Sequence, residues 1–478
     1  MKLNKIAISA LCLVMAAQMS DAKVKLPGII SDNMVLEQQT EANLWGSTQS
    51  KKKVKVTTSW NKKDYTVKAD KNGNWKLAVA TPNAGGPYTI TFDDGDKTVI
   101  SNVLIGEVWY CSGQSNMGQP MKGYPSQPTG GSIDAIINAK PQTPIRICIV
   151  SGEPAKKASE VNEAQWFLNE PEHVAEASAT AYYFALHLQK ALNIPVGIIV
   201  CAWGGSTVQS WMSRDVISRD FMELDLSFLD NSDPNMDRAS LRPCTMFNGK
   251  VAPLTNYTIK GFNWYQGEGN IDDPELYSRL LPAYAKMMRN LWGQGDIPFH
   301  YVQIAPFKYT PDKKAALIRE AQLKAMDIIP NSGMVVTLDI GNPDCVHPMY
   351  KSEVGQRLSY LALDKAYHIG GFDGQAPRYK NMEVKGNVAY INCETGDYTI
   401  APVNKPLAEF EIAGEDKVFH PADAKIRIVN KQGQIMVSSP KVKHPVAVRY
   451  CFRNAPAASV FNSFGLPLAP FRTDDWEY

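Results

Sequence analysis

The chain has 478 residues, of which 44% are hydrophobic, enough material for packed cores in roughly two or three domains. Its 50 lysine and arginine residues nearly balance its 48 aspartate and glutamate residues, so the formal net charge is only +2 at pH 7. A charge this small gives no electrostatic reason to expect a nucleic acid or an anionic membrane as the partner. The composition instead favours a small, weakly charged partner.

The first 22 residues have the pattern of a signal peptide. Lys2 and Lys5 precede the apolar run 6–17, and Ser20 and Ala22 form a small-x-small cleavage site. We therefore expect cleavage near Ala22 and a secreted or periplasmic mature protein. No later segment has about 18 consecutive apolar residues, so no membrane span is expected.

Seven cysteines follow the signal peptide, and an odd number leaves at least one thiol unpaired. Because a chain of this size builds a core without covalent links, we expect mostly buried thiols and no disulfide scaffold. The seven are Cys111, Cys148, Cys201, Cys244, Cys345, Cys393 and Cys451.

Two parts of the mature chain have the pattern of β structure. Residues 23–102 contain short alternating runs at 54–58 and 87–92, with a hairpin-type turn at 70–74, and predict an N-terminal β region of sandwich type. Residues 366–478 predict a C-terminal β region, which either stands alone or packs on the first. Its expected strands are 388–391, 425–429, 435–438 and 446–451.

Between these regions, residues 103–365 alternate apolar runs with segments of helical apolar spacing. This alternation predicts the α/β fold class, with a parallel sheet flanked by helices. The expected strands are 103–111, 195–200, 299–304 and 333–338, and the expected helices are 177–192, 275–292, 313–328 and 351–363.

The first of these strands ends in the turn 112–116, which contains Ser115. A turn at the end of a rigid sheet can present a serine hydroxyl as a nucleophile. Such a serine also needs a base and hydrogen-bond donors for the developing oxyanion. Ser115 is therefore a candidate nucleophile only if both follow in the chain.

The best candidate base is His347, because Asp344 precedes it by three residues in a loop that leaves a predicted strand. Glu170 precedes His173 by the same spacing, but no predicted strand leads into that segment. By itself, such a spacing is more often an incidental loop histidine beside a helix-capping aspartate. Asp339 is the alternative acid for His347.

Candidate oxyanion donors follow two further apolar strands, at the sheet edge where α/β sites form. The glycines of segment 201–206 allow a backbone N–H to approach a ligand closely. Segment 261–270 ends in the amide of Asn270. Each glycine turn alone is more often an ordinary tight turn.

Four segments together resemble the SGNH (GDSL-like) hydrolases, and more closely their sialate O-acetylesterase-like family. They are Gly113-Gln114-Ser115-Asn116-Met117, Trp203-Gly204-Gly205-Ser206, Trp264-Tyr265-Gln266-Gly267-Glu268-Gly269-Asn270 and Asp344-Cys345-Val346-His347-Pro348, in the order of the family. Segments 31–36, 85–88, 247–254 and 470–474 are also similar to the family, so the resemblance covers nearly the whole mature chain.

The resemblance implies a three-layer α/β/α SGNH-hydrolase domain between the two β regions. It implies Ser115 as the nucleophile, His347 as the general base and Asp344 as the carboxylate that orients the base. The oxyanion hole would comprise the N–H groups of Ser115 and Gly205 and the side chain of Asn270. The implied chemistry is acyl transfer through an acyl-enzyme, for which we expect no metal or organic cofactor.

Residues within these segments are candidate substrate contacts. We expect Gln114, Trp203, Gln266 and Glu268 to bind substrate, with the indole stacking on a sugar ring. Gly269 departs from the family, in which a serine more often precedes the asparagine. The aromatic residues in or near these segments could form a platform for sugar rings, and burial in the core is an equally good interpretation of each. They are Trp109, Trp203, Trp211, Trp264 and Tyr265.

The favoured substrate is 9-O-acetylated sialic acid, because the family resemblance points to it. An acetylesterase of plant polysaccharide (xylan, xyloglucan or pectin) is the alternative with the same chemistry. A non-catalytic carbohydrate-binding protein is the alternative of a different class. A basic residue at the pocket would favour sialic acid, which carries a carboxylate, and the candidates are Arg146, Arg242 and Arg319.

Overall fold

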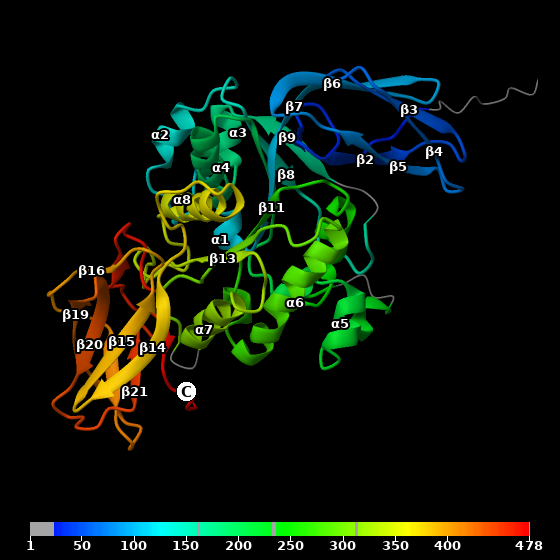
Figure 1. The fold of residues 1–478 in the computed structure, drawn as a ribbon. Helices are drawn as coiled ribbons and strands as arrows, with labels where there is room; N and C mark the ends of the chain where they lie inside the picture. The colour runs from blue at the N-terminus through cyan, green and yellow to red at the C-terminus, as the bar shows by residue number, and fades with distance from the viewer. Residues whose placement is uncertain (1–22, 160–162, 232–235, 311–313, 478) are drawn as a thin grey trace, which may run out of the picture.

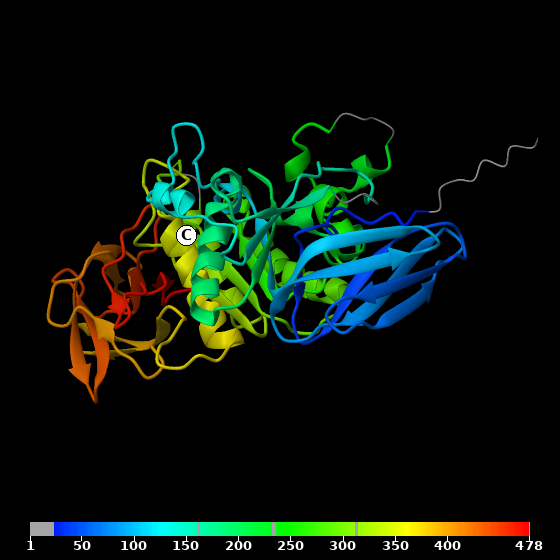
Figure 2. The ribbon, with the colours of Figure 1, turned by 90° about the horizontal axis from the view of Figure 1, so that it is seen from above.

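The computed structural model describes residues 23–159, 163–231, 236–310 and 314–477. Figures 1 and 2 show a central α/β unit with one β unit at each end. The predicted signal peptide, residues 1–22, lies outside the described residues. None of the described helices is long and apolar enough to cross a membrane.

A mostly parallel sheet forms the centre of the molecule. Its strands are β7 (Lys97–Gly113), β8 (Ile145–Val150), β9 (Ala164–Leu168), β10 (Val196–Ala202), β11 (Gly261–Tyr265), β12 (Phe299–Val302) and β13 (Ser332–Val335). They lie in the order β13-β12-β11-β7-β10-β8-β9, and every neighbouring pair is parallel except β8 and β9. The predicted mixed α/β fold with a parallel sheet is therefore confirmed.

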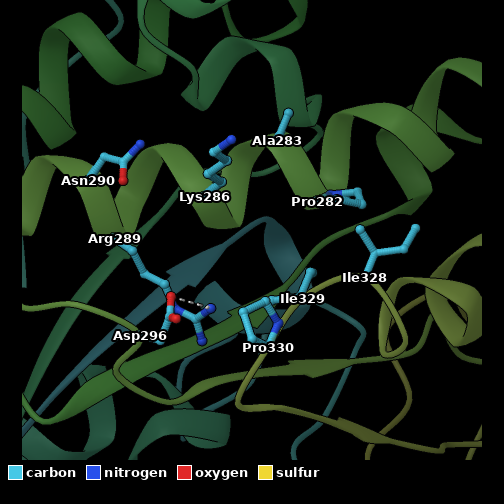
Figure 3. A pocket seen from close by; sticks show the side chains of 9 residues that line it. All are labelled: Pro282, Ala283, Lys286, Arg289, Asn290, Asp296, Ile328, Ile329 and Pro330. Atoms are coloured by element: carbon cyan, nitrogen blue, oxygen red, sulfur yellow. Dashed lines mark ion pairs between the residues drawn. The ribbon is translucent and has the colours of Figure 1, made fainter.

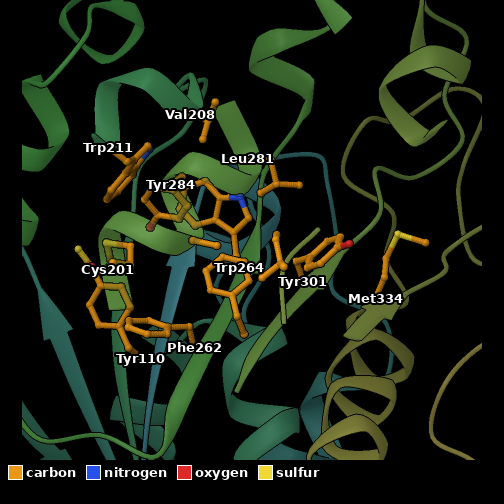
Figure 4. Packing of buried hydrophobic residues seen from close by; sticks show 14 of the residues in the cluster. Tyr110, Cys201, Val208, Trp211, Phe262, Trp264, Leu281, Tyr284, Tyr301 and Met334 are labelled. Atoms are coloured by element: carbon orange, nitrogen blue, oxygen red, sulfur yellow. The ribbon is translucent and has the colours of Figure 1, made fainter. Parts of the chain in front are cut away.

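Helices cover both faces of this sheet. The α-helices of this unit are α1 (Ser115–Gly118), α2 (Ser132–Ile137), α3 (Pro171–Glu176), α4 (Ala179–Leu192), α5 (Arg214–Asp220), α6 (Pro274–Trp292), α7 (Ala315–Ala325) and α8 (Lys351–Leu361). Trp109 and Ile198 belong to the core beneath α4 and α8, whereas Tyr110 and Ile199 belong to the core beneath α6 and α7. Figure 4 shows Tyr110 in the second core with Leu281 and Tyr284 of α6. Successive strand residues alternate between faces, so each buried strand supplies both cores. The four helices predicted in this unit are present as α4, α6, α7 and α8.

The N-terminal β unit shares strand β7 with the central sheet. Its other strands are β1 (Val35–Glu37), β2 (Glu41–Ser47), β3 (Lys53–Thr58), β4 (Asp64–Lys68), β5 (Asn74–Ala80) and β6 (Gly85–Asp93). Residues 97–105 of β7 pair with β6, and residues 107–113 pair with β10. The boundary that we expected between residues 102 and 103 therefore lies inside one continuous strand.

The turn at 70–74 connects two sheets of the N-terminal unit. Strand β4 before the turn pairs with β3, and strand β5 after it pairs with β2. The prediction of a turn was right, but the prediction of a hairpin was wrong. Short-range turn signals do not decide which strand becomes the partner.

The C-terminal β unit consists mainly of two four-stranded antiparallel sheets. The strands are β14 (Arg378–Lys385), β15 (Val388–Glu394), β16 (Ile400–Ala401), β17 (Phe410–Ala413), β18 (Phe419–Pro421), β19 (Asp423–Val429), β20 (Gln432–Ser438), β21 (Ala447–Tyr450), β22 (Phe461–Asn462) and β23 (Phe471–Arg472). The sheets have the orders β14-β15-β20-β19 and β18-β17-β21-β23. In both views this unit lies at the opposite end of the molecule from the N-terminal β unit, so the two do not pack on each other (Figures 1 and 2).

All seven cysteines of the described chain are free thiols. Five are buried, and Cys345 and Cys393 are partly buried. The prediction of mostly buried thiols without a disulfide scaffold is confirmed.

Candidate active site

Four loops meet at the carboxyl edge of the central sheet. Ser115 follows β7, Gly205 follows β10, Asn270 follows β11 and His347 follows β13. Because these strands are parallel, their following loops leave the same edge. The strand order reverses at β7, which has β10 on one side and β11 on the other. Such a switch point is where open α/β sheets bind their ligands.

Ser115 is held in place by contacts between its own turn and the loop after β11. The N–H of Gln114 donates to the carbonyl of Tyr265 at 3.0 Å, and the side-chain oxygen of Gln114 accepts from the N–H of Gly269 at 3.2 Å. Gly113 has a φ of +143°, and a Cβ there would lie 2.1 Å from the Tyr265 carbonyl oxygen. This close approach requires glycine. The half-buried Ser115 then begins helix α1.

The imidazole of His347 reaches the Ser115 hydroxyl. Ser115 Oγ lies 2.6 Å from Nε2 of His347, and Nδ1 lies 2.5 Å from Oε1 of Gln127. An amide oxygen only accepts, so Nδ1 carries the proton and Nε2 is the acceptor. The ring of Tyr124 stands edge-on to the imidazole with 5.3 Å between centroids. This is the tautomer that a general base needs in order to take the serine proton.

The predicted contact between Asp344 and His347 is not present in this structure. Asp344 is exposed, and its carboxylate lies 2.9 Å from Nζ of Lys308. The alternative acid, Asp339, forms a two-point ion pair with Arg357. A spacing of three residues brings side chains together on a helix. Residues 344–347 are not helical, so the spacing does not produce the contact here.

Gln127 takes the position that we expected a carboxylate to occupy. It belongs to the loop between α1 and α2, far from His347 in the sequence. No spacing or motif relates residues 127 and 347, so only the tertiary fold reveals this contact. The sequence analysis missed Gln127 for this reason.

His347 is neutral at pH 7. Burial, and after it the positive charge of Lys351, lowers the pKa of His347 to about 4. The Gln127 amide orients the ring without the negative charge that would favour the imidazolium. The unprotonated Nε2 is therefore available to accept a proton across the physiological range.

Two donors set the orientation of the Asn270 carboxamide. Its Oδ1 accepts from the N–H of Val208 at 2.9 Å and from Nε2 of Gln266 at 2.8 Å. The amide nitrogen therefore points the other way, and one of its hydrogens goes to Oε1 of Gln209 at 2.9 Å. Nδ2 has two hydrogens and one acceptor among the described residues, which leaves one donor for a ligand.

Two backbone N–H groups that we predicted for the oxyanion hole are free of backbone acceptors. Gly205 is exposed and has a φ of +66°. Within the described chain, neither its N–H nor that of Ser115 donates to a backbone carbonyl. Both groups remain available to a ligand oxygen.

The departure at Gly269 has a steric reason. A Cβ at this position would lie 2.4 Å from the carbonyl oxygen of Ser206. A serine would therefore separate the loop that carries Asn270 from the loop that carries Gly205. In this chain the glycine permits the close approach of the two loops.

Three of the four predicted substrate contacts hold the loops of the site. Gln114 and Gln266 are buried, and Gln266 Nε2 donates to Asn270. Glu268 accepts from Asn116 at 2.7 Å. These interactions do not fit direct contact with a sugar. Trp203 is half-buried, which leaves part of its ring accessible.

The other aromatic residues near the site belong to the core. Figure 4 shows Trp211 and Trp264 among the buried rings next to Tyr284 of α6, and the Trp264 and Tyr284 ring centroids lie 4.4 Å apart. Trp109 and Tyr265 are also fully buried. Of the two interpretations given to these four residues, the core interpretation is the correct one for this structure.

A pocket elsewhere on the molecule has no groups for acyl transfer. Figure 3 shows it between helix α6 and the segment 328–330, with Arg289 and Asp296 forming an ion pair at 3.7 Å. Its described lining contains neither a serine nor a histidine. The lining residues are Pro282, Ala283, Lys286, Arg289, Asn290, Asp296, Ile328, Ile329 and Pro330.

Comparisons with known proteins point to the same chemistry. Residues 105–364 match the family described as carbohydrate esterase, sialic acid-specific acetylesterase. The proteins of Homo sapiens and Mus musculus named sialate O-acetylesterase are each 27% identical to this chain. The human match covers 76% of this chain and 75% of that protein, and the mouse match covers 92% and 93%. The crystal structure of a carbohydrate acetylesterase from Xanthomonas citri is 31% identical, with a TM-score of 0.85, and covers 95% of this chain and 100% of that chain.

The fold and these matches define a carboxylic ester hydrolase that acts on acetylated carbohydrate. More particularly, the chain belongs to the sialic acid-specific acetylesterase family of carbohydrate esterases, whose match spans more than half of its length. The predicted relationship to the sialate O-acetylesterase-like proteins is thereby confirmed.

Proposed function

We propose that this protein is a secreted serine esterase of the SGNH type that removes O-acetyl groups from carbohydrate. The observation that carries the proposal is the 2.6 Å contact between Ser115 Oγ and His347 Nε2 at the carboxyl edge of the parallel sheet. We place the catalytic domain at residues 103–365, between β domains at 23–102 and 366–478, with strand β7 continuous across the first boundary. The leader pattern at 1–22 supports export.

The reaction proceeds in two halves. Nε2 of His347 takes the proton of Ser115, and Oγ attacks the acetyl carbonyl to form a tetrahedral oxyanion. The N–H groups of Ser115 and Gly205 and the Nδ2 group of Asn270 hold this oxyanion, each contributing about 3 kcal/mol to lowering the barrier. The bond to the sugar oxygen breaks, and the imidazolium protonates that oxygen. Water then attacks the acetyl-enzyme with His347 again as base, which releases acetate and restores Ser115.

We assign 9-O-acetylated sialic acid as the favoured substrate, in line with the names of the mammalian relatives. Arg146 and Arg319 are buried and therefore unsuited to bind the sialate carboxylate. Arg242 is half-buried, and the carbonyl of the residue before it accepts from Oγ1 of Thr207 at 3.0 Å. Because Thr207 lies two residues after Gly205, Arg242 is the arginine that we propose for this carboxylate.

Acetate release from a panel of substrates tests this assignment. The panel is 9-O-acetylated sialic acid and acetylated xylan, xyloglucan and pectin, each with wild type and Ser115→Ala. We expect a kcat/KM at least about tenfold higher for the sialic acid, and we expect Arg242→Gln to lower that value without affecting neutral xylan. Activity on xylan alone would instead assign the protein to polysaccharide deacetylation. Equal rates for wild type and Ser115→Ala would contradict a serine esterase.

The group that orients His347 is tested by two substitutions. Gln127→Ala removes the acceptor on Nδ1, and we expect kcat to fall about tenfold or more because the ring is less well oriented. Asp344→Asn alters an exposed side chain paired with Lys308, and we expect kcat within about threefold of wild type. Asp344 can act as the predicted acid only by leaving Lys308 and displacing Gln127 from Nδ1. A loss near 10⁴-fold in Asp344→Asn, typical of a triad aspartate, would establish that rearrangement.

A further inference from the structure

Lys351 is a buried lysine that contacts two segments of the proposed catalytic site. It is the first residue of helix α8 and has no exposed surface. Its Nζ donates to Oδ1 of Asn116 at 2.8 Å and to the carbonyl of Pro348 at 2.7 Å. Asn116 follows Ser115, and Pro348 follows His347. One ammonium group therefore joins the residue after the nucleophile to the residue after the base.

Asn116 extends this connection to a third segment. Its Nδ2 donates to the carbonyl of Val346 at 3.0 Å and to Oε1 of Glu268 at 2.7 Å. Val346 precedes His347, and Glu268 lies two residues before Asn270. Lys351, Asn116 and Glu268, which we call the Lys351 network, thus connect the nucleophile, the base and the loop of the Asn270 amide.

Helix stability does not explain a lysine at this position. A positive charge at the start of a helix faces the positive end of the helix dipole. Burial of an ammonium group also has a large desolvation cost, and burial lowers the pKa of Lys351 to about 7 although Glu268 opposes this shift. A buried charge kept at such a cost beside a catalytic group is a candidate for a functional role.

Among the described residues, the charged and titratable groups that act on Lys351 come from two loops. Glu268 belongs to the loop after β11, and Cys345 and His347 belong to the loop before α8. Helix α4 presents the hydroxyl of Thr180, which donates to the Asn116 carbonyl at 3.1 Å and carries no charge. Lys351 is therefore the cation that acts on the His347 imidazole, where it disfavours the protonated form.

We propose that Lys351 is a positioning residue for the esterase reaction, which holds the His347 loop against the nucleophile through its hydrogen bonds to Asn116 and to the Pro348 carbonyl. This inference rests on the proposed roles of Ser115 and His347. When Lys351 is protonated, its charge adds to burial in disfavouring the imidazolium form of His347.

The pH dependence of kcat/KM tests the charge, and kcat tests the position. For wild type we expect kcat/KM to fall on the acid side of its pH profile near pH 4, where His347 protonates; we call this fall the acid limb. Lys351→Met removes the charge, so the imidazolium becomes less unfavourable and the acid limb moves up by about one pH unit. The same variant loses the anchor of the His347 loop, and we expect kcat to fall about 10- to 100-fold. Lys351→Arg retains the charge and is expected to keep the low acid limb.

A double variant and a surface control complete the experiment. Lys351→Met with Glu268→Gln removes both buried charges together, so it avoids an unpaired carboxylate if the single variant does not fold. Lys122→Met removes an exposed lysine paired with Glu176, and we expect it to leave both the acid limb and kcat unchanged.

A folded Lys351→Met variant with a kcat within about twofold of wild type would overturn the positioning role. An unshifted limb in the folded Lys351→Met or double variant would also overturn it. An inactive Ser115→Ala together with an unshifted Lys351→Met would refute this inference alone, whereas an active Ser115→Ala would refute the proposed function.

Discussion

Replacement of Ser115 by alanine is expected to lower kcat by about 10⁴- to 10⁶-fold and to leave KM nearly unchanged. The substitution removes the Oγ atom that lies 2.6 Å from Nε2 of His347, so no acetyl-enzyme can form. The backbone turn that precedes Ser115 is held by Gln114 and Gly113 and does not depend on the hydroxyl. The remaining activity would come from water attack on substrate held by the oxyanion donors.

Acetate release under substrate saturation measures this loss, with thermal unfolding to show that the variant is folded. Ser218→Ala is the matched control, because Ser218 lies on the surface helix α5 and its Oγ donates to the Arg214 carbonyl. We expect its kcat to stay within about twofold of wild type. A Ser115→Ala variant that retained more than about a tenth of the wild-type kcat would exclude Ser115 as the nucleophile.

His347→Ala is expected to cause a loss of similar size. Without the imidazole no group accepts the Ser115 proton, so the hydroxyl remains a weak nucleophile. In the proposed mechanism, Ser115 and His347 act as one unit. We therefore expect the double variant to be about as active as either single variant. Losses in kcat that multiplied in the double variant would show that the two residues act independently.

His173 provides a control with the same local spacing. Glu170 precedes it by three residues, and His173 Nδ1 lies 3.4 Å from Oε2 of Glu170 at the start of helix α3. His173 lies in none of the four loops of the proposed site, so His173→Ala should leave kcat within about twofold of wild type and cost less than about 1 kcal/mol of stability. A large loss of activity in this variant would point to a base other than His347.

These two histidines also show what a spacing rule can predict. Asp344 and His347 have the same separation as Glu170 and His173, yet the acidic partner reaches its histidine only in the second pair. The difference is that residues 170–173 enter a helical turn and residues 344–347 do not. A spacing of three residues therefore predicts a side-chain contact only where the local backbone is helical.

The apolar periodicity of the sequence was sufficient for the long helices and several buried parallel strands of the central unit, but it did not predict β8, β9 or the short helices α2, α3 and α5. Burial of one helix face or of a whole parallel strand leaves a regular pattern in the residues themselves, and α4, α6 and β10 lie where that pattern predicted them. The pairing of strands could not be predicted from this periodicity, because each strand pairs with residues that are distant in sequence. The 70–74 turn and the shared strand β7 are the examples.

The sequence by itself determined the family relationship and the positions of Ser115, Gly205, Asn270 and His347 at the ends of parallel strands, since such strands place their following loops at one edge. Only the tertiary structure decided which groups meet there. Gln127 reaches Nδ1 of His347 across the fold, and Lys351 of the following helix reaches Asn116 beside Ser115. Both contacts arise from packing between segments that share no local pattern.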